Sequence, residues 1–460
     1  MFRGRVRHVH FIGVGGVGMC GLAEILNNME FEVSGSDLRE NDNGRRLARA
    51  GVTVHIGHQK ENVHGADVVV YSSAIKDDNA EIVEARRTHT PVISRAEMLA
   101  ELMRVKYGVA LAGTHGKTTT TSLVATVLRA AGLDPTVVVG GRMAALGSNA
   151  QLGAGDLLVA EADESDGSFL RLTPTIACIT NIDPEHLDHY ESYEALKDAF
   201  VEFAEKVPFY GLAVLCLDHP TVQEVLPRIR RRNTTYGMSP QADYHAKNVR
   251  YHGTSTTFDV FHKTKPFGQF TVRMPGNHNV LNTLAAIAIA DELEVPLDVI
   301  KDALSNFGGV ARRFTITAEP KGIALVDDYG HHPAEVAATL TAARRAYSGR
   351  VIVVFQPHRY SRTEHLFDDF TRSFNNADLL YVCDVYAAGE KPIEGATADC
   401  LVSAMNQHGH HAAHYVPRYA DVPKLVAEQA RPGDVVLSLG AGDINKVLPM
   451  IERALNAAGA

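Results

Sequence analysis

Two strand-like runs in this chain each end in a glycine-rich turn that opens a helix-like stretch. The first run, His8 to Ile12, leads into the turn 13–18, and the second, Tyr107 to Ala112, leads into the turn 113–118. Glycines in such a turn let backbone N–H groups approach a phosphate at a helix N-terminus. Two such units indicate two nucleotide-type domains built on parallel sheets.

Apolar runs of strand length alternate with helix-like stretches along most of the chain, which predicts an α/β fold. Between about 242 and 274, alternating β-branched and aromatic residues predict an antiparallel edge of the second domain. A third unit is predicted, with strands at 322–326, 351–355, 379–382 and 435–439. For 460 residues we expect three domains: a Rossmann-like domain at 1–105, a P-loop domain with a β-rich edge at 106–309 and a Rossmann-like domain at 310–460.

Charge and cysteine content exclude several functional classes. The 45 basic and 54 acidic residues give a net charge of −9 spread along the chain, so we expect no cationic face for a nucleic acid. Five cysteines without a C-x-x-C pair argue against a disulfide framework or a structural zinc site. The sequence shows no signal-peptide core and no apolar stretch of about 18 residues. We therefore expect a cytoplasmic protein that binds no nucleic acid and inserts into no membrane.

The first turn matches the pattern G-x-G-x-x-G. Its glycines are Gly13, Gly15 and Gly18, with Gly16 between them, and Asp37 follows 19 residues after Gly18. The N–H groups of such a turn bind a diphosphate, and an acidic residue at the end of the next strand can bind ribose hydroxyls. NAD and a UDP-sugar both carry these parts, so the pattern does not identify the nucleotide. A merely tight strand-to-helix turn is the alternative.

The second turn ends in Gly-Lys-Thr, which is typical of a loop that binds nucleotide phosphates. Leu111 stands where the pattern G-x-x-x-x-G-K-[ST] has its first glycine, and Gly113 supplies the flexibility instead. We expect Lys117 to reach the β- and γ-phosphates and Thr118 to ligate Mg²⁺. A lysine at an exposed helix start is the alternative. Two phosphate loops need two phosphorylated ligands, which disfavours a plain dehydrogenase.

Acidic and histidine side chains follow two strand-like runs after the second turn. Glu161 to Asp166 come after the run 157–160, and Asn181 to Tyr190, which include His186, come after the run 175–180. The carboxyl ends of parallel strands meet at one edge of a sheet, so these side chains can share a metal, and carboxylate oxygens suit Mg²⁺. Solvated loops or helix caps are the alternative.

The third unit carries two further polar turns, at 327–333 and 356–362. Arg359 and Arg362 are three residues apart, so they can lie on one helical face and hold a carboxylate with their guanidinium groups. A surface pair of arginines is the alternative.

Seven motifs make this sequence resemble the Mur ligases over its whole length: GVGGVGMCGLAE (13–24), AGTHGKTTTT (112–121), EADESD (161–166), NIDPEHLDHY (181–190), GNHNVLN (276–282), GVARRF (309–314) and DDYGHHPAE (327–335). The resemblance implies an ATP-dependent ligase of peptidoglycan precursor synthesis, with a role in cell wall formation, cell shape and cell division. The first motif favours the family member that joins the lactyl carboxylate of UDP-N-acetylmuramate to L-alanine. The implied route is an acyl phosphate, which the amine converts to an amide, leaving ADP and phosphate. A monomer or weak homodimer is expected.

The resemblance also implies roles for individual residues. Catalysis is assigned to Lys117, Glu161 and His186, and Mg²⁺ binding to Thr118, Glu161 and His186. ATP contacts are assigned to Gly113, Thr114, His115, Gly116, Lys117, Thr118, Thr119, Asn279, Asn282, Arg313 and Asp328. UDP-sugar contacts are assigned to Gly13, Gly15, Gly16, Gly18, Asp37, His58, Ser72 and Ser73. Contacts with the amino acid are assigned to Tyr329, His331, Arg359 and Arg362.

Two functions of other classes are alternatives. An NAD-dependent oxidoreductase would use only the first turn and leaves Lys117 unexplained, and a nucleotide sensor would bind both nucleotides without forming an amide. Within the ligase class, an enzyme that recycles a whole murein peptide is the nearest rival, and activity on free L-alanine or on the tripeptide separates the two. The general base, the ligands of a second Mg²⁺ and the order of substrate binding are left open.

Overall fold

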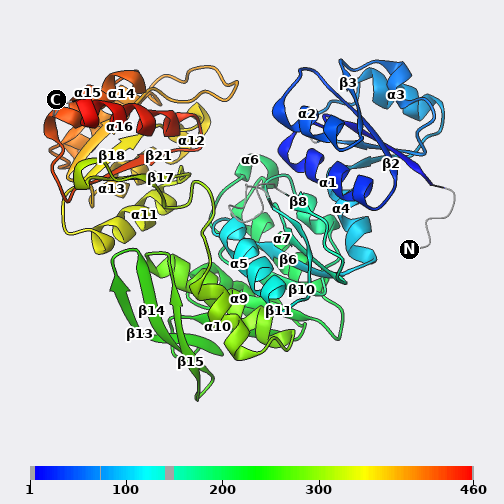
Figure 1. The fold of residues 1–460 in the computed structure, drawn as a ribbon, viewed down its shortest axis with the longest axis horizontal. Helices are drawn as coiled ribbons and strands as arrows, with labels where there is room; N and C mark the ends of the chain where they lie inside the picture. The colour runs from blue at the N-terminus through cyan, green and yellow to red at the C-terminus, as the bar shows by residue number, and fades with distance from the viewer. Residues whose placement is uncertain (1–5, 73, 140–149, 458–460) are drawn as a thin grey trace. The chain divides into compact units, whose positions relative to one another are not determined.

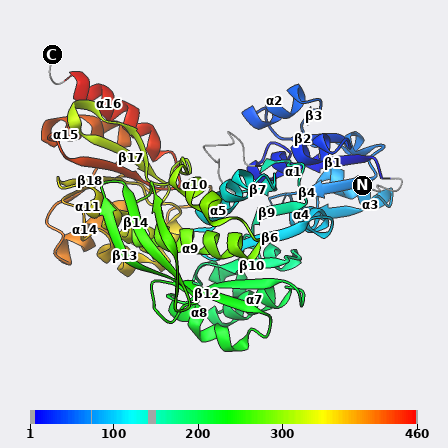
Figure 2. The same ribbon diagram turned by 60° about the horizontal axis from the view of Figure 1, so that its bottom comes forward.

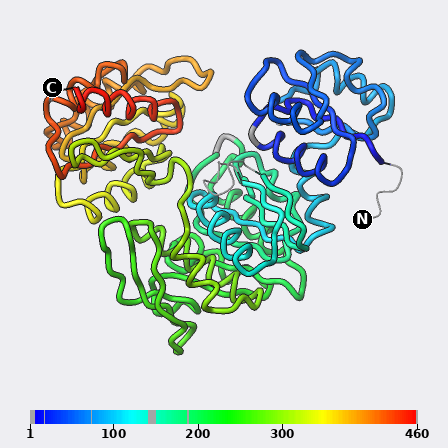
Figure 3. Tube along the Cα trace, viewed as in Figure 1, coloured from blue at the N-terminus to red at the C-terminus, as the bar shows by residue number. Residues whose placement is uncertain are grey.

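The computed structural model describes residues 6–72, 74–139 and 150–457, and this part of the chain forms three β-sheets connected by helices (Figure 1). The predicted α/β class is confirmed, and the path of the chain through the sheets can be followed in Figure 3. None of the helices in the described ranges is both long enough and apolar enough to span a membrane. The chain packs as two compact units, one formed by Met1–Lys247, Asp259–Phe270 and Leu281–Gly308, and the other by Asn248–Phe258, Thr271–Val280 and Gly309–Ala460.

The N-terminal sheet has five parallel strands in the order β3-β2-β1-β4-β5. They are β1 (His8–Ile12), β2 (Glu32–Asp37), β3 (Thr53–Ile56), β4 (Val68–Tyr71) and β5 (Val92–Ser94). The helices of this part are α1 (Val17–Asn28), α2 (Asp42–Arg49), the 3₁₀ helix η1 (Lys60–Val63), α3 (Ala80–Arg87) and α4 (Arg95–Arg104). A central β1 with strands winding outward on both sides is the Rossmann arrangement, as the sequence predicts.

The central sheet has ten strands in the order β15-β14-β13-β12-β11-β10-β6-β9-β7-β8. Its strands are β6 (Tyr107–Ala112), β7 (Thr136–Val138), β8 (Ala150–Gln151), β9 (Leu157–Glu161), β10 (Ile176–Ile179), β11 (Leu212–Cys216), β12 (Asn233–Gly237), β13 (Tyr244–His252), β14 (Ser255–His262) and β15 (Lys265–Val272). Its helices are α5 (Lys117–Ala130), η2 (Ser168–Arg171), α6 (Leu187–Tyr190), α7 (Tyr193–Glu205), α8 (Pro220–Val225), η3 (Leu226–Arg228), α9 (Asn277–Glu292) and α10 (Leu297–Ser305). β6 lies between β10 and β9 and is parallel to both, so the ends of all three strands meet at one edge.

The predicted antiparallel edge of this sheet is confirmed in β13, β14 and β15, of which Figure 2 labels the first two. Two residues connect β13 to β14 and two connect β14 to β15. Neighbouring strands with such short connections form hairpins, which are antiparallel. The alternating apolar and polar residues of this stretch match a sheet edge that is buried on one face.

The C-terminal sheet has six strands in the order β16-β17-β21-β18-β19-β20, and only β16 is antiparallel to its neighbour. The strands are β16 (Thr315–Ala318), β17 (Ala324–Asp328), β18 (Val351–Phe355), β19 (Leu379–Val382), β20 (Ala413–Tyr415) and β21 (Val435–Leu439). The helices are η4 (Pro320–Gly322), α11 (Pro333–Ala346), α12 (Tyr360–His365), α13 (Phe367–Ser373), α14 (Ala398–Gln407), η5 (Tyr419–Asp421), α15 (Val422–Gln429), η6 (Ile444–Lys446) and α16 (Val447–Ala457). β17 begins two residues later than predicted because η4 takes up the preceding residues.

Aromatic packing fixes the acidic segment that follows β9. Phe169 of η2 is 1% exposed, and its ring centroid lies 5.2 Å from that of Phe200 and 5.1 Å from that of Phe203. Both partners lie on α7 and are fully buried. Such aromatic contacts stabilise beyond the area they bury, so η2 anchors the segment 161–166 to the core.

Replacement of Phe200 by alanine should lower the free energy of unfolding by roughly 3–5 kcal/mol, because it removes a buried ring and leaves a cavity. Urea unfolding followed by circular dichroism measures this loss. Phe209→Ala is the control, since Phe209 is 87% exposed, and we expect a change within about 0.5 kcal/mol there. Equal effects of the two substitutions would contradict the assigned core.

Candidate active site

The second glycine turn forms a loop between β6 and α5 that only glycine fits at two positions. Gly113 and Gly116 have φ angles of 127° and 84°. A Cβ at Gly113 would lie 2.1 Å from Thr180 Oγ1, and a Cβ at Gly116 would lie 2.6 Å from Asn282 Oδ1. Both backbone conformation and space therefore require glycine at these positions. The loop is the tight strand-to-helix turn that phosphate binding needs.

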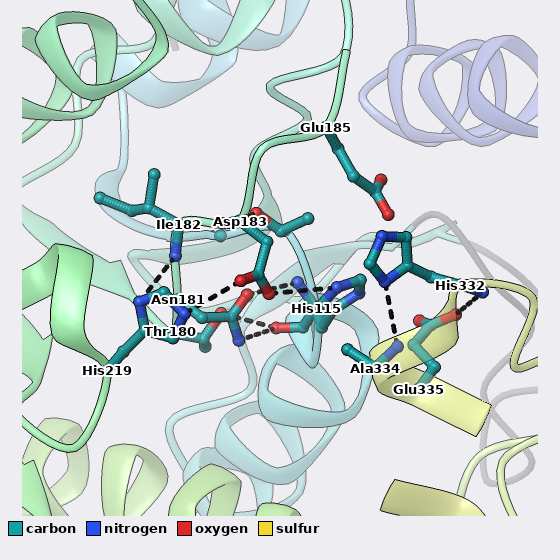
Figure 4. Close-up of polar contacts among 12 residues, drawn as sticks. His115, Thr180, Asn181, Ile182, Asp183, Glu185, His219, His332, Ala334 and Glu335 are labelled. Atoms are coloured by element: carbon teal, nitrogen blue, oxygen red, sulfur yellow. Dashed lines mark hydrogen bonds and ion pairs between the residues drawn. The ribbon is translucent and has the colours of Figure 1, made fainter. Parts of the chain in front are cut away.

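The end of β10 holds this loop in place (Figure 4). The His115 N–H donates to Asn181 Oδ1 at 2.7 Å, and Asn181 Nδ2 donates to the His115 carbonyl oxygen at 2.9 Å. Thr180 Oγ1 donates to the same carbonyl oxygen at 2.6 Å. The Asp183 N–H donates to Thr114 Oγ1 at 2.8 Å. Thr114 and His115, both predicted to contact ATP, are thus fixed by the segment 180–183.

Asp183 lies between two histidines at the side of this loop (Figure 4). Its Oδ2 is 3.3 Å from His115 Nε2, and its Oδ1 is 3.2 Å from His219 Nε2. Burial alone would raise the pKa of Asp183, but its hydrogen bonds with the two histidines outweigh burial and hold this pKa well below its usual range. A charged carboxylate therefore orients the His115 ring next to the phosphate loop.

Lys117, the first residue of α5, makes four polar contacts. Its Nζ lies 2.9 and 2.7 Å from the two carboxylate oxygens of Glu164. The same Nζ donates to the carbonyl oxygens of Gly113, at 2.7 Å, and Thr114, at 3.3 Å. The Glu164 side chain is 1% exposed, and Tyr190 donates its hydroxyl proton to the Glu164 carbonyl oxygen at 2.5 Å. The ammonium group is therefore held at the loop, where the sequence predicts the β- and γ-phosphates.

The charges around Lys117 keep it protonated. Burial alone would lower its pKa, but Glu164, with Asp163 and Glu161, outweighs burial and raises the pKa of Lys117. Burial raises the pKa of Glu164, and Lys117 opposes that shift. The two side chains thus form a buried ion pair. Lys117 is stabilised in its charged form, whereas the charged form of Glu164 is stabilised by Lys117 against the effect of burial.

Thr118 and Glu161, two predicted ligands of Mg²⁺, lie side by side. Thr118 Oγ1 donates to the two carboxylate oxygens of Glu161 at 3.0 and 3.1 Å. A hydroxyl and a carboxylate beside a phosphate loop are the oxygen donors that Mg²⁺ prefers, so this pair fits the ion. His186, the third predicted ligand, has its Nε2 3.8 Å from Glu164 Oε1. Glu164 thus has Lys117 and His186 as neighbours.

The other residues assigned to ATP divide between the two compact units. Asn282 is buried beside the loop, and its Oδ1 accepts a hydrogen bond from Thr120 Oγ1 at 3.2 Å. Thr119 is buried in the first turn of α5. Asn279 belongs to the other unit, where its Nδ2 donates to the carbonyl oxygen of Pro275 at 2.8 Å.

Asp328 and Arg313, also assigned to ATP, belong to that other unit as well. Asp328 ends β17 and accepts hydrogen bonds from the N–H groups of Phe314 and Gly330, both at 2.8 Å. Burial nevertheless raises the pKa of Asp328 to about 6. Arg313 Nη1 lies 3.6 Å from Glu335 Oε1. These contacts hold both residues at the carboxyl end of β17.

In the first glycine turn, Asp37 already binds a backbone amide. The Gly15 N–H donates to Asp37 Oδ2 at 2.9 Å. Gly13 has a φ of 80°, and Gly16 is the N-cap of α1. Asp37 therefore lies at the turn, as the sequence predicts, and its carboxylate uses a donor that a phosphate would also use.

The weaker candidates near this turn have different surroundings. His58 Nδ1 lies 2.9 Å from Ser36 Oγ and 3.4 Å from Oε2 of the buried Glu81. Ser72 lies next to the turn, since its Cβ is 3.5 Å from where a Cβ on Gly13 would be. Ser73 lies outside the described residues. The structure thus brings Ser72 to the turn and includes His58 in a buried polar network.

The predicted amino-acid pocket begins after β17. The ring centroids of Tyr329 and His331 are 5.3 Å apart, and that of His331 is 5.9 Å from that of His358. His331 Nδ1 lies 3.3 Å from Glu335 Oε2 on α11. The turns that follow β17 and β18 therefore meet, as the carboxyl ends of parallel strands in one sheet can do.

The two predicted arginines lie at the turn after β18. Arg362 Nη1 is 3.5 Å from His358 Nδ1, and the His358 ring stacks on Tyr386 at a centroid distance of 5.4 Å. Arg359 has a φ of 70°, and its N–H donates to the Tyr386 carbonyl oxygen at 2.9 Å. A non-glycine residue at positive φ is a strained conformation of the kind found at binding sites. The backbone at Tyr386 thus fixes the conformation of the turn that carries Arg359 and Arg362.

Both histidines of this cluster are neutral at pH 7. Burial, with help from the Arg362 charge and against that of Glu335, lowers the pKa of His331 to about 4. Burial, with Arg362 and Arg359, lowers the pKa of His358 to about 4. Because the imidazoles are uncharged, the positive charge of this cluster lies on the arginines, whose guanidinium groups can hold a carboxylate.

Several residues of these clusters have no role predicted from the sequence. They are Glu164, Asp183, His219, His358 and Tyr386. Glu164 and Asp183 stand inside the motifs EADESD and NIDPEHLDHY, so the signal for them was present. Burial and pairing, which the sequence does not give, distinguish Glu164 from its acidic neighbours. Tyr386 is brought to the arginine turn by a backbone bridge with His358, which has no local sequence signal.

Three known protein domains match consecutive parts of the chain. The Mur ligase family catalytic domain matches residues 8–107, the Mur ligase middle domain matches residues 111–290, and the Mur ligase glutamate ligase domain matches residues 312–442. Together they cover most of the sequence. Six of the seven motifs that carry the resemblance lie within these matches, and the seventh, GVARRF (309–314), overlaps the start of the third match.

Individual relatives match the chain over nearly its full length. The UDP-N-acetylmuramate–L-alanine ligase of Sorangium cellulosum is 67% identical, covering 99% of this chain and 98% of the relative. The enzyme of the same name from Myxococcus xanthus is 57% identical, and the match covers 97% of this chain and 95% of the relative. The crystal structure of UDP-N-acetylmuramate-alanine ligase from Thermotoga maritima has a TM-score of 0.81 at 28% identity, covering 98% and 99%. A murein peptide ligase from Psychrobacter arcticus shares the fold, with a TM-score of 0.67 at 23% identity and 98% coverage of both chains.

The variants Lys117→Met and Glu164→Leu should each lower the free energy of unfolding by roughly 3–5 kcal/mol, because each leaves one buried charge without its partner. The double variant should lose much less, and urea unfolding of all four proteins gives the coupling energy. The exposed pair of Arg104 and Glu101 is the control, for which we expect a coupling of about 0.5 kcal/mol or less. Additive effects at Lys117 and Glu164 would exclude the ion pair.

Protonation of His358 should destabilise the fold in acid. The pKa of His358 is about 4 in the folded protein and about 6.5 in the unfolded chain. As the pH falls from 6.5 toward 4, the unfolded chain therefore binds a proton that the folded protein does not, and the free energy of unfolding decreases. The variant His358→Gln should therefore lose less stability than the parent between pH 6.5 and 4, by roughly 1–3 kcal/mol. Urea unfolding at several pH values measures the difference. Parallel curves for the two proteins would show that His358 titrates normally.

Proposed function

The chain belongs to the Mur ligase family, and we propose that it joins the lactyl carboxylate of UDP-N-acetylmuramate to the amine of L-alanine, with conversion of ATP to ADP and phosphate. The near-full-length identity of 67% to a relative of that name supports this choice of substrates. The observation that carries the chemistry is the protonated Lys117 at a glycine loop, next to the oxygen donors of Thr118 and Glu161.

In the first step, a carboxylate oxygen of UDP-N-acetylmuramate attacks the γ-phosphorus of ATP. The bond from this phosphorus to the β,γ-bridging oxygen breaks, and its electron pair leaves with ADP, so that an acyl phosphate forms. Lys117 exchanges Glu164 for the β- and γ-phosphate oxygens and offsets the repulsion between the anionic partners. Mg²⁺ held by Thr118 and Glu161, with His186 nearby, would supply further charge neutralisation at the phosphates.

In the second step, the amine of L-alanine attacks the acyl carbon. Arg359 and Arg362 hold the carboxylate of the amino acid, and Tyr329 lines the pocket. The ammonium form of the amino acid loses a proton before this attack, and the uncharged imidazoles of His331 and His358 do not repel it. The tetrahedral intermediate then expels phosphate and leaves the amide.

The first glycine turn holds the diphosphate of the UDP-sugar in this proposal, and Asp37 binds its ribose after releasing the Gly15 amide. The chain then divides by substrate: residues 1–105 bind the UDP-sugar, 106–309 bind ATP and 310–460 bind the amino acid. As an early enzyme of cell wall synthesis, acting on a nucleotide-linked precursor, it would work in the cytoplasm and support cell shape and division.

The variant Lys117→Ala should lose at least about a hundredfold in kcat/KM, because it removes the fixed positive charge at the transferring phosphate. Phosphate release in the presence of ATP, UDP-N-acetylmuramate and L-alanine measures the rate. The parent should release phosphate only when all three are present, and not when a murein tripeptide replaces L-alanine. Lys424→Ala, at an 84% exposed side chain, is the control. A loss below about tenfold at Lys117 would remove the lysine from the mechanism.

A further inference from the structure

Arg95, the first residue of α4, occupies the space beside Gly18 in the first glycine turn. A Cβ at Gly18 would lie 3.1 Å from both Cδ and Nη1 of Arg95. Gly18 is within α1, whose backbone conformation any residue can adopt. Glycine is therefore needed at position 18 to leave space for the Arg95 side chain, and not because of the backbone conformation. The third glycine of the motif gives a guanidinium group access to the turn.

The turn itself offers hydrogen-bond donors without positive charge. Residues 13–18 are glycines and valines only. α1 has Gly16 as its N-cap without a side-chain hydrogen bond, and its first turn has no acidic residue. The first N–H groups of such a helix favour an anion. The Asp37 carboxylate on the Gly15 N–H is an anionic oxygen at this place.

Arg95 has its charge available for a ligand. Within the described residues, no acidic side chain forms an ion pair with Arg95. Desolvation alone would raise the pKa of Asp163, but Lys117 and, more weakly, Arg95 lower it. Arg95 is therefore close enough to the acidic segment after β9 to act on its charge, while it lies against the first turn.

The start of α4 is fixed on both sides of Arg95. Ser94 Oγ accepts from the Glu97 N–H at 3.3 Å, and Glu97 Oε2 accepts from the Ser94 N–H at 2.6 Å, which forms a capping box. Glu97 also forms an ion pair with Arg171 of η2, the helix that follows the acidic segment. The guanidinium group of Arg95 thus extends from a backbone that is fixed by the capping box and by the ion pair with η2.

We propose that Arg95 binds the diphosphate of the UDP-linked substrate at the first glycine turn and so fixes that substrate in relation to the phosphate loop. The planar guanidinium group can bond two phosphate oxygens at once, in addition to the N–H groups of the turn. This inference rests on the proposed function, since it needs a nucleoside diphosphate at this turn. Arg95 is a binding and positioning residue and takes no part in bond making.

The test compares Arg95→Met, Arg95→Lys and Gly18→Ala with the parent. Titration calorimetry gives the affinity for UDP and for UDP-N-acetylmuramate without ATP, and ligand NMR gives the affinity for uridine, which has no phosphate. Arg95→Met should weaken binding of both diphosphates by about tenfold to a hundredfold and leave uridine binding unchanged. Arg95→Lys should recover part of this loss, because it keeps the charge but not the fork. Gly18→Ala, which displaces the arginine without removing its charge, should weaken diphosphate binding in the same sense.

Steady-state kinetics completes the test, with Arg104→Met as the matched control at the exposed end of the same helix. We expect the KM for UDP-N-acetylmuramate to rise in Arg95→Met, while kcat at saturation and the KM for ATP change by less than about threefold. The control should match the parent. Unchanged UDP affinity in Arg95→Met, or an equal loss of uridine affinity, would overturn the role of Arg95. The proposed function would still hold in that case if the parent forms product. A parent that neither binds UDP nor forms product would overturn the proposed function itself.

Discussion

The buried ion pair between Lys117 and Glu164 is the interaction on which the rest of the structure depends. It joins the start of α5 to the acidic segment after β9, and two loop carbonyl oxygens complete the hydrogen bonds of the ammonium group. Such a pair is stable in a protein interior only when its polar atoms are satisfied, as they are here. In the proposed mechanism a nucleotide phosphate takes the place of the carboxylate, so the lysine is charged and oriented before the substrate arrives.

The two compact units shift the pKa values of their basic side chains in opposite directions. In the first unit, Lys117 is kept charged by three carboxylates, which suits a step between anions. In the second, burial and nearby arginines keep His331 and His358 uncharged, which leaves the positive charge of the proposed pocket to the arginines that would hold a carboxylate. In the proposed mechanism, phosphate transfer uses the charged group of the first unit, and the second unit binds the amino acid.

Much of the fold could be predicted because buried parallel strands are continuous apolar runs that the sequence displays. β1, β6, β18, β19 and β21 begin and end at the predicted residues. The roles of Glu164 and Arg95 could not be predicted, since they depend on burial and on contacts between distant parts of the chain. The contact of Arg95 with Gly18 joins residues 77 positions apart. Asn279 and Arg313 keep their assigned roles as predictions, because their contacts in the structure are with their own unit.

The acyl phosphate is the central claim, and oxygen transfer tests it most directly. UDP-N-acetylmuramate labelled with ¹⁸O in both lactyl carboxylate oxygens is incubated with the protein, ATP and L-alanine, and the inorganic phosphate is examined by ³¹P NMR. If the acyl phosphate forms, each phosphate carries one ¹⁸O and the other label stays in the amide carbonyl. Unlabelled phosphate, formed together with the amide, would contradict it.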